Sequence, residues 1–127
     1  MTRLLVVRHG ETAWNREGRL QGWAPVGLND RGREQARALA ADLPTVLDGD
    51  GVDRLVTSDL ERAQETSRVV RESVPADLDL PAPEPTRAFR ERHLGVYQGL
   101  LVEDLRERHP ELRDIGSVTG LSTTPEG

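Results

Sequence analysis

A histidine that directly follows a short apolar run is the first residue in this sequence that can do chemistry. Residues 4–7 read Leu-Leu-Val-Val, and Arg8-His9-Gly10 comes next. A neutral imidazole held in one tautomer can act as a nucleophile, and arginine offers a planar fork that fits phosphate oxygens. The alternative is a surface histidine at a strand end, which is the better interpretation of an isolated histidine. The apolar run and the polar residues that follow favour the nucleophile here.

Arg62 is the second candidate. Ser58 and Glu61 have the S-x-x-E spacing of a capping box, which predicts a helix start and places Arg62 in the first turn. Positive charge is slightly unfavourable there because of the helix dipole, so an anionic ligand would explain the arginine. The alternative is a solvated arginine paired with a neighbouring acidic residue, such as Asp59 or Glu65.

Glu91 is the third candidate, within Arg90-Glu91-Arg92-His93. A carboxyl group at a strand end can act as a general acid or base if burial raises its pKa. Two flanking arginines oppose such a shift. A surface glutamate in a salt bridge is therefore a serious alternative.

The elements that must position these residues alternate between strands and helices. Strands are predicted at residues 4–7 and 54–57 and within 86–90, and residues 8–28 and 75–85 are rich in glycine or proline and predict irregular connections. A helix should begin at Asn29 or Asp30, and Pro44 is compatible with its end. Its inward stripe is Ala36, Leu39, Ala40 and Leu43.

Two further helices complete the pattern. One begins at the Ser58 capping box, with an apolar stripe of Leu60, Ala63, Val70 and Val74. The last runs over about 100–108, with its inward residues Leu101, Leu105 and Val102. From residue 114 onward the apolar residues show no helical or strand periodicity. Residues 114–127 are therefore predicted to be an irregular tail of a single domain spanning 1–127.

This order of elements predicts an α/β fold with a mainly parallel sheet. In such sheets ligands lie beyond the carboxyl ends of the strands. That rule places Arg8-His9-Gly10 and residues 58–62 at the same edge.

Composition excludes several classes of protein. The 127 residues include 22 acidic side chains and 17 arginines but no lysine, for a net charge of −5, and no cysteine. Disulfide-stapled modules, thiolate metal sites and cysteine nucleophiles are therefore excluded, and general nucleic-acid binding is not expected. No apolar run is long enough to span a membrane, and charges follow residues 4–7 too soon for a signal peptide. We therefore expect a cytoplasmic protein without membrane partners.

The motifs together resemble the signature of the histidine phosphatase superfamily, the phosphoglycerate mutase-like fold. The resemblance runs through residues 5–12, 14–15, 20–23, 28–32, 35–36 and 57–66, and then through Arg90-Glu91, Gly95 and Gln98-Gly99. Several motifs in the right order are far more specific than one triplet. The resemblance implies a three-layer α/β/α fold whose later strands and helices this chain lacks.

The resemblance also implies roles. His9 would be the nucleophile that becomes phosphohistidine, and Glu91 the proton donor to the leaving group. Arg8, Arg62 and Asn15 would bind the phosphoryl oxygens. Gln21 and Gly22 are further candidates for substrate contacts. No metal or organic cofactor is implied, and the partner would be a small phosphorylated metabolite.

Two departures from the family limit what the resemblance implies. The family's loop often has Asp and Pro where this chain has Pro25 and Gly27. Family members also carry a second catalytic histidine in a Ser-His-Gly-like motif, whereas the histidines here are His9, His93 and His109. Because that second histidine motif is missing, we expect little or no turnover from this chain. The end of the sequence resembles the opening of the family's Pro-x-Gly-Glu-Ser segment.

Three functions remain open at this point. A phosphatase is favoured because this sequence has neither of two features of the mutases: a lysine just after the glycine that corresponds to Gly99, and a later pair of adjacent arginines. A phosphoglycerate mutase is the second, since residues 91–93 and 98–100 resemble those enzymes. A non-catalytic phosphate-binding remnant is the third.

Overall fold

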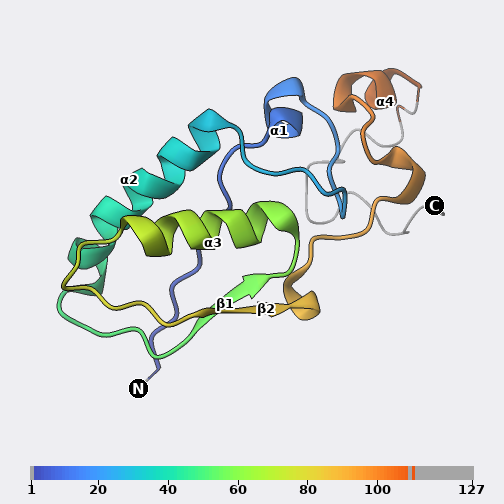
Figure 1. The fold of residues 1–127 in the computed structure, drawn as a ribbon. Coiled ribbons are helices and arrows are strands. Elements are labelled where there is room, and N and C mark those ends of the chain that lie inside the picture. Colours follow the sequence, from blue (N-terminus) through green and yellow to red (C-terminus); the bar gives the residue numbers. More distant parts are fainter. Residues whose placement is uncertain (1, 109, 111–127) are drawn as a thin grey trace.

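The computed structural model describes residues 2–108 and 110, and the predicted tail at 114–127 lies outside them. Figure 1 shows the arrangement of the elements, which follow in chain order: α1 Ala13–Glu17, α2 Asp30–Leu47, β1 Leu55–Ser58, α3 Glu61–Ser73, β2 Pro83–Thr86, the 3-10 turns η1 Arg87–Phe89 and η2 Gly95–Tyr97, and α4 Val102–Arg108.

The parallel sheet predicted from the order of elements is confirmed. β1 and β2 pair in parallel, with Leu55 opposite Pro83 and Ser58 opposite Thr86. The predicted strand at 54–57 forms one residue later, as β1. The strand predicted within 86–90 forms earlier, as β2, and 87–89 is a 3-10 turn instead. Proline has no backbone N–H to donate to a neighbouring strand. β2 can still contain two prolines, because alternate N–H groups of a strand point to opposite sides and an edge strand forms hydrogen bonds on one side only.

The strand predicted at residues 4–7 is wrong for the part of the chain that the structure describes. No described strand pairs with these residues. Leu4 and Val6 are 81% and 85% exposed. An apolar run becomes a buried strand only when a neighbouring strand supplies hydrogen bonds and cover, and no described strand does so here.

Helix α2 begins as predicted and ends one turn later than Pro44 suggests. The Asn29 side chain accepts a hydrogen bond from the Gly32 N–H and caps the first turn. Pro44 lies inside the helix, which continues to Leu47 and stops at Asp48 in the left-handed region, with φ 49°. The predicted stripe is confirmed, since Ala36, Ala40 and Leu43 are buried and Leu39 is partly buried.

Helix α3 packs along α2 and lies against the strands (Figure 1). The predicted capping box is wrong, because Ser58 ends β1 and the helix starts at Glu61. The Ser58 hydroxyl accepts instead from the Leu60 N–H, at 3.2 Å. Of the predicted stripe, Leu60 and Val70 are buried, whereas Ala63 and Val74 are only partly buried. The helix also turns Arg62 and Thr66 inward.

One hydrophobic core joins α2, α3 and the segment that leads to β2. Its buried residues are Ala36, Ala40, Leu43, Leu47, Val69, Val70 and Leu80. Helix α4 lies outside this core. Its first residue, Val102, donates to the Gly18 carbonyl at 2.8 Å, and residues 99 and 100 before it exchange backbone hydrogen bonds with Leu20. Leu105 is its buried residue, as predicted, while Leu101 and Val102 are partly buried.

Candidate active site

His9 lies in the loop before α1 with its ring half buried. The Nδ1 atom is 2.7 Å from the Gly10 carbonyl oxygen, so Nδ1–H donates there and Nε2 keeps its lone pair. Burial lowers the pKa of His9 below its ordinary value of 6.5, and the positive charges of Arg62 and Arg8 lower that pKa further. The Gly10 carbonyl and Glu91 act in the opposite direction without reversing the shift. The ring is therefore neutral near pH 7 and presents a nucleophilic nitrogen.

Two glycines let the His9 loop touch the first turn of α2. A Cβ added at Gly10 would lie 2.5 Å from the Gly32 carbonyl oxygen. A Cβ at Gly32 would collide with the backbone of Glu11. Backbone therefore contacts backbone at this point, and larger residues would push His9 away from α2.

Thr66 ties the same loop to α3. Its hydroxyl accepts from the Gly10 N–H at 3.0 Å and donates to the Arg62 carbonyl at 2.7 Å. Thr66 is buried, so both bonds are shielded from water. The backbone beside His9 is thus linked to the helical turn that carries Arg62.

Arg62 is the most buried charged side chain in the described part of the chain, at 2% exposure. Its Nη2 donates to the Gly22 carbonyl at 2.7 Å and to Glu91 Oε2 at 2.6 Å. Its Nη1 is buried and has no hydrogen-bond partner among the described residues. A buried donor left without an acceptor costs about 1–3 kcal/mol, and more when it is charged, so an acceptor bound at Nη1 would remove that cost.

Glu91 reaches this arginine from the loop after η1. Its side chain is about half exposed, and only one of its carboxylate oxygens contacts Arg62. The remaining part of the carboxyl group is open to solvent. The structure thus brings together three of the sequence-predicted residues, His9, Arg62 and Glu91.

Asn15 and Gln21 are both tied to Thr12. The Asn15 Oδ1 accepts from the Thr12 N–H at 3.0 Å, which turns the amide NH₂ of Asn15 away from that bond. The Thr12 hydroxyl donates to Gln21 Oε1 at 2.5 Å, and Gln21 is buried. Gln21 and the Gly22 carbonyl therefore support the neighbouring site residues, and a substrate contact by either one stays a prediction.

A hollow of about 560 Å³ opens beside His9. It is lined by Arg8, His9 and Asn15, by residues of α2 such as Gln35, and by Thr66 of α3. Arg8 is exposed and extends the positive charge of the site toward solvent. Three of the predicted residues thus share one opening.

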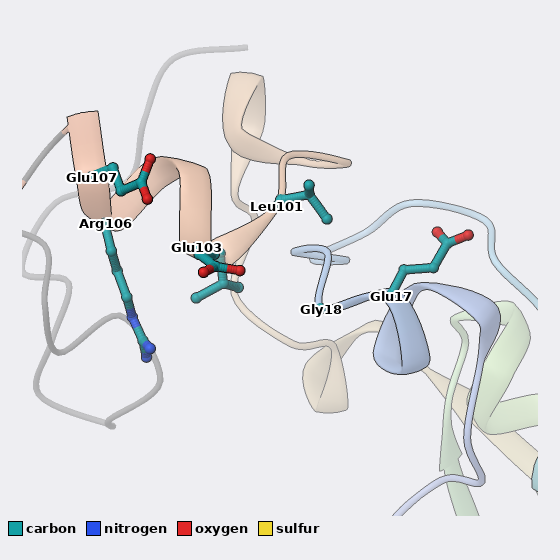
Figure 2. A pocket seen from close by; sticks show the side chains of 7 residues that line it. Glu17, Gly18, Leu101, Glu103, Arg106 and Glu107 are labelled. Carbon is teal, nitrogen blue, oxygen red and sulfur yellow. The ribbon is translucent and has the colours of Figure 1, made fainter.

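A second hollow, of about 490 Å³, has the opposite character. It lies between the end of α1 and α4, and Figure 2 shows its carboxylates, Glu17, Glu103 and Glu107, together with Arg106, the one cation among the described residues that line it. Its net negative charge disfavours a phosphate. None of the predicted site residues lines it.

Two further residues, Thr66 and Trp23, contact the predicted site residues or their backbone and are not among the residues predicted from the sequence. Thr66 lies four residues after Arg62, on the same helical face, and that spacing is a signal that could have found it. Trp23 donates its indole N–H to the Glu91 carbonyl, and no spacing rule predicts this contact across 68 residues.

Within residues 2–108 and 110, no group of three or more His, Asp or Glu side chains is arranged to hold a metal ion. None of the helices in this range is long and apolar enough to cross a membrane.

Comparison with known proteins identifies the family of this chain. The profile of the histidine phosphatase superfamily (branch 1) matches residues 4–125. Phosphoglycerate mutase-like protein 4 of Arabidopsis thaliana is 39% identical over 85% of this chain and 44% of its own length. A metal-independent phosphoserine phosphatase of the same plant is 34% identical over 87% of this chain and 44% of its own length.

A solved structure shares the fold as well. A mycobacterial glucosyl-3-phosphoglycerate phosphatase in complex with VO₃ superposes with a TM-score of 0.65 at 32% identity, covering 84% of this chain and 49% of that one. The chain therefore belongs to the histidine phosphatase superfamily. It spans less than half the length of the curated relatives named above.

Proposed function

We propose that this chain transfers phosphoryl groups from small phosphate esters to His9 and acts as a phosphatase. One observation carries the proposal: a neutral, half-buried His9 with Nδ1 occupied lies near a buried Arg62 whose Nη1 lacks a partner among the described residues. The relatives include phosphatases and mutase-like proteins, and phosphohistidine chemistry suits both.

The reaction has two steps. In the first, His9 Nε2 attacks phosphorus while the ester P–O bond breaks. The leaving oxygen keeps the electron pair of that bond and receives a proton from the Glu91 carboxyl group. In the second, water attacks the phosphohistidine and gives a proton to the Glu91 carboxylate, and the N–P bond breaks toward Nε2. Arg8, Arg62 and the Asn15 amide would bind the phosphoryl oxygens and stabilise the charge that develops there.

Trapping of the intermediate tests this proposal. The purified chain is incubated with ³²P-labelled acetyl phosphate, and acid-labile label is mapped by proteolysis and mass spectrometry. We expect label on the peptide that contains His9, lost in His9→Asn and retained in His93→Asn, the matched control. Label that persists in His9→Asn would overturn the proposal.

Turnover of the 127-residue chain is expected to be weak. The resemblance implies a second histidine at the phosphoryl group, and the sequence has no such motif. Loss of one donor to a developing oxyanion costs about 10²–10³ in rate. Robust hydrolysis of an aryl phosphate that disappears in His9→Ala would contradict this expectation.

We further propose a single cytoplasmic domain for residues 1–127.

A phosphoglycerate mutase is the second candidate, favoured by the 39% identity to a mutase-like relative. The product separates the two functions. Inorganic phosphate released from 3-phosphoglycerate indicates the phosphatase, whereas 2-phosphoglycerate formed without phosphate release indicates the mutase.

A further inference from the structure

We propose that Trp23 is a positioning residue that holds Glu91 against Arg62. This inference rests on the proposed function, in which Glu91 moves the proton and Arg62 binds the phosphoryl group. Glu91 lies in a loop, and its side chain is half exposed. Something other than packing of its own side chain must therefore place it.

The first support is a direct hydrogen bond. The indole Nε1–H of Trp23 donates to the backbone carbonyl of Glu91 at 2.6 Å. The backbone N–H of Trp23 donates to Gln98 Oε1 at 2.8 Å. Trp23 thus contacts the segment that contains Glu91 at two points, at Glu91 itself and at Gln98.

The second support is the surroundings of the indole ring. The guanidinium of Arg90 lies 4.6 Å from the ring centroid and that of Arg87 lies 5.3 Å from it. The His93 ring meets the indole edge to face, with centroids 4.5 Å apart. Residues on both sides of Glu91 therefore pack on one aromatic ring.

The third support is that Trp23 joins both acceptors of Arg62. The Nη2 group of Arg62 donates to the Gly22 carbonyl and to the Glu91 carboxylate. Gly22 precedes Trp23 in the chain, and Glu91 accepts the indole N–H. A loss of the indole N–H should thus release one of the two acceptors while the other stays.

The experiment compares Trp23→Phe, Glu91→Gln and the double variant, with Trp14→Phe as the matched control on the other tryptophan. The first readout is the ¹⁵N NMR spectrum of the Arg62 guanidinium, assigned with Arg62→Lys. We expect Glu91→Gln to change these signals, Trp23→Phe to change them in the same direction, and Trp14→Phe to leave them unchanged.

The second readout is the affinity for inorganic phosphate. Because the Glu91 carboxylate offsets the charge of Arg62 and repels a nearby anion, we expect Glu91→Gln to tighten phosphate binding by about fivefold or more. Trp23→Phe should tighten binding by a smaller factor, and in the Glu91→Gln background it should add nothing. A purely structural role for Trp23 would weaken binding equally in both backgrounds.

The outcomes separate the two proposals. Arg62 signals that stay as in the wild type in Trp23→Phe while Glu91→Gln moves them would overturn the role of Trp23, as would equal weakening in both backgrounds. Signals that respond to Trp23→Phe without any phosphohistidine would overturn the proposed function alone. If Trp23→Phe does not fold, β-benzothienylalanine at position 23 in the Trp14→Phe background keeps the ring shape, lacks the N–H and is judged by the same criteria.

Discussion

The protonation and tautomer of His9 depend on the burial of its ring, on two nearby guanidinium groups and on one carbonyl. Burial and the charges of Arg62 and Arg8 favour the neutral ring, while the Gly10 carbonyl selects the tautomer in which Nε2 is free. A phosphohistidine enzyme needs both properties, because a protonated or wrongly oriented imidazole cannot attack phosphorus. The neighbours Arg8 and Gly10 and the distant Arg62 thus act on the same imidazole ring.

The first prediction concerns the titration of His9. By NMR we expect a midpoint below 6.5, and Arg8→Gln should move it upward because one repelling charge is removed. Arg8 is exposed, so this substitution should not disturb the fold. Arg37→Gln, at an exposed position of α2, serves as the control and should leave the midpoint in place.

The lowered pKa of His9 also determines how this residue changes the free energy of unfolding with pH. As the pH falls below 6.5, the unfolded chain takes up a proton at His9 before the folded chain does. His9 therefore makes folding less favourable from there down to the folded pKa, and its contribution is constant below that value. A midpoint above 6.5 would contradict the burial and charges that we describe.

At the scale of elements, the contact between the His9 loop and α2 determines where His9, the proposed nucleophile, lies. The second prediction is that Gly32→Ala destabilises the protein and weakens phosphate binding. In an open helix position the change from Gly to Ala would stabilise by about 1 kcal/mol, but the new Cβ would collide with the Glu11 backbone here. Thermal unfolding and phosphate titration measure the two effects.

Gly51→Ala is the matched control for that substitution. A Cβ at Gly51 would meet no atom within 4 Å, and its φ is not positive. We expect stability and phosphate affinity close to those of the wild type. Equal effects of the two substitutions would show that the close approach at Gly32 is unimportant.

The third prediction concerns the ion pair between Asp59 and Arg90, which joins the start of α3 to the Glu91 loop. The two side chains form bonds of 2.6 and 2.7 Å. The hydrogen bond from Arg90 lowers the pKa of Asp59 below its ordinary 3.8. The unfolded chain takes up a proton first as the pH falls, so the contribution is complete above 3.8 and is lost as the pH falls through the folded pKa.

Comparison of Asp59→Asn with the wild type tests this directly. The difference in thermal midpoint between the variant and the wild type should be present at neutral pH. It should disappear as the pH falls below the pKa of Asp59 in the folded protein. Glu84→Gln, which removes the partner of Arg54 at the far end of the sheet, should leave the Glu91 loop and phosphate binding unchanged. A difference for Asp59→Asn that does not depend on pH would contradict the assignment.

At the scale of the whole molecule, the apolar face of residues 4–7 stands out. Leu4, Val6 and Val7 are 81%, 85% and 49% exposed, and no described strand pairs with their backbone. An exposed apolar segment with free backbone groups can pair with other chains. Next to it lies the hollow that contains His9.

The fourth prediction is therefore that the isolated chain binds a hydrophobic dye and associates with rising concentration. Leu4→Ser together with Val6→Thr should reduce both effects, measured by dye fluorescence and sedimentation velocity. Val46→Thr, at an exposed position of α2, is the control and should change little. Unchanged association in the double variant would show that another surface is responsible.

Local rules predicted much of this protein. The Asn29 cap and the apolar stripe of α2 agree with the structure, because both depend on residues within one or two turns. The capping box at Ser58 was wrong, since Ser58 extends β1 and its hydroxyl is used in a turn. The strand at residues 4–7 was also wrong, because strand formation depends on a neighbour that local pattern cannot supply.

The sequence by itself determined the family, the parallel α/β order and the residue types at the site, because motif spacing and helical periodicity are local properties of the chain. The tertiary structure alone decided that Arg62 is buried with one donor free of a described partner, that Thr66 links it to the backbone beside His9, and that Trp23 holds Glu91. Such contacts join residues tens of positions apart. Their distances depend on how α2, α3 and the loops pack together, which local rules do not describe.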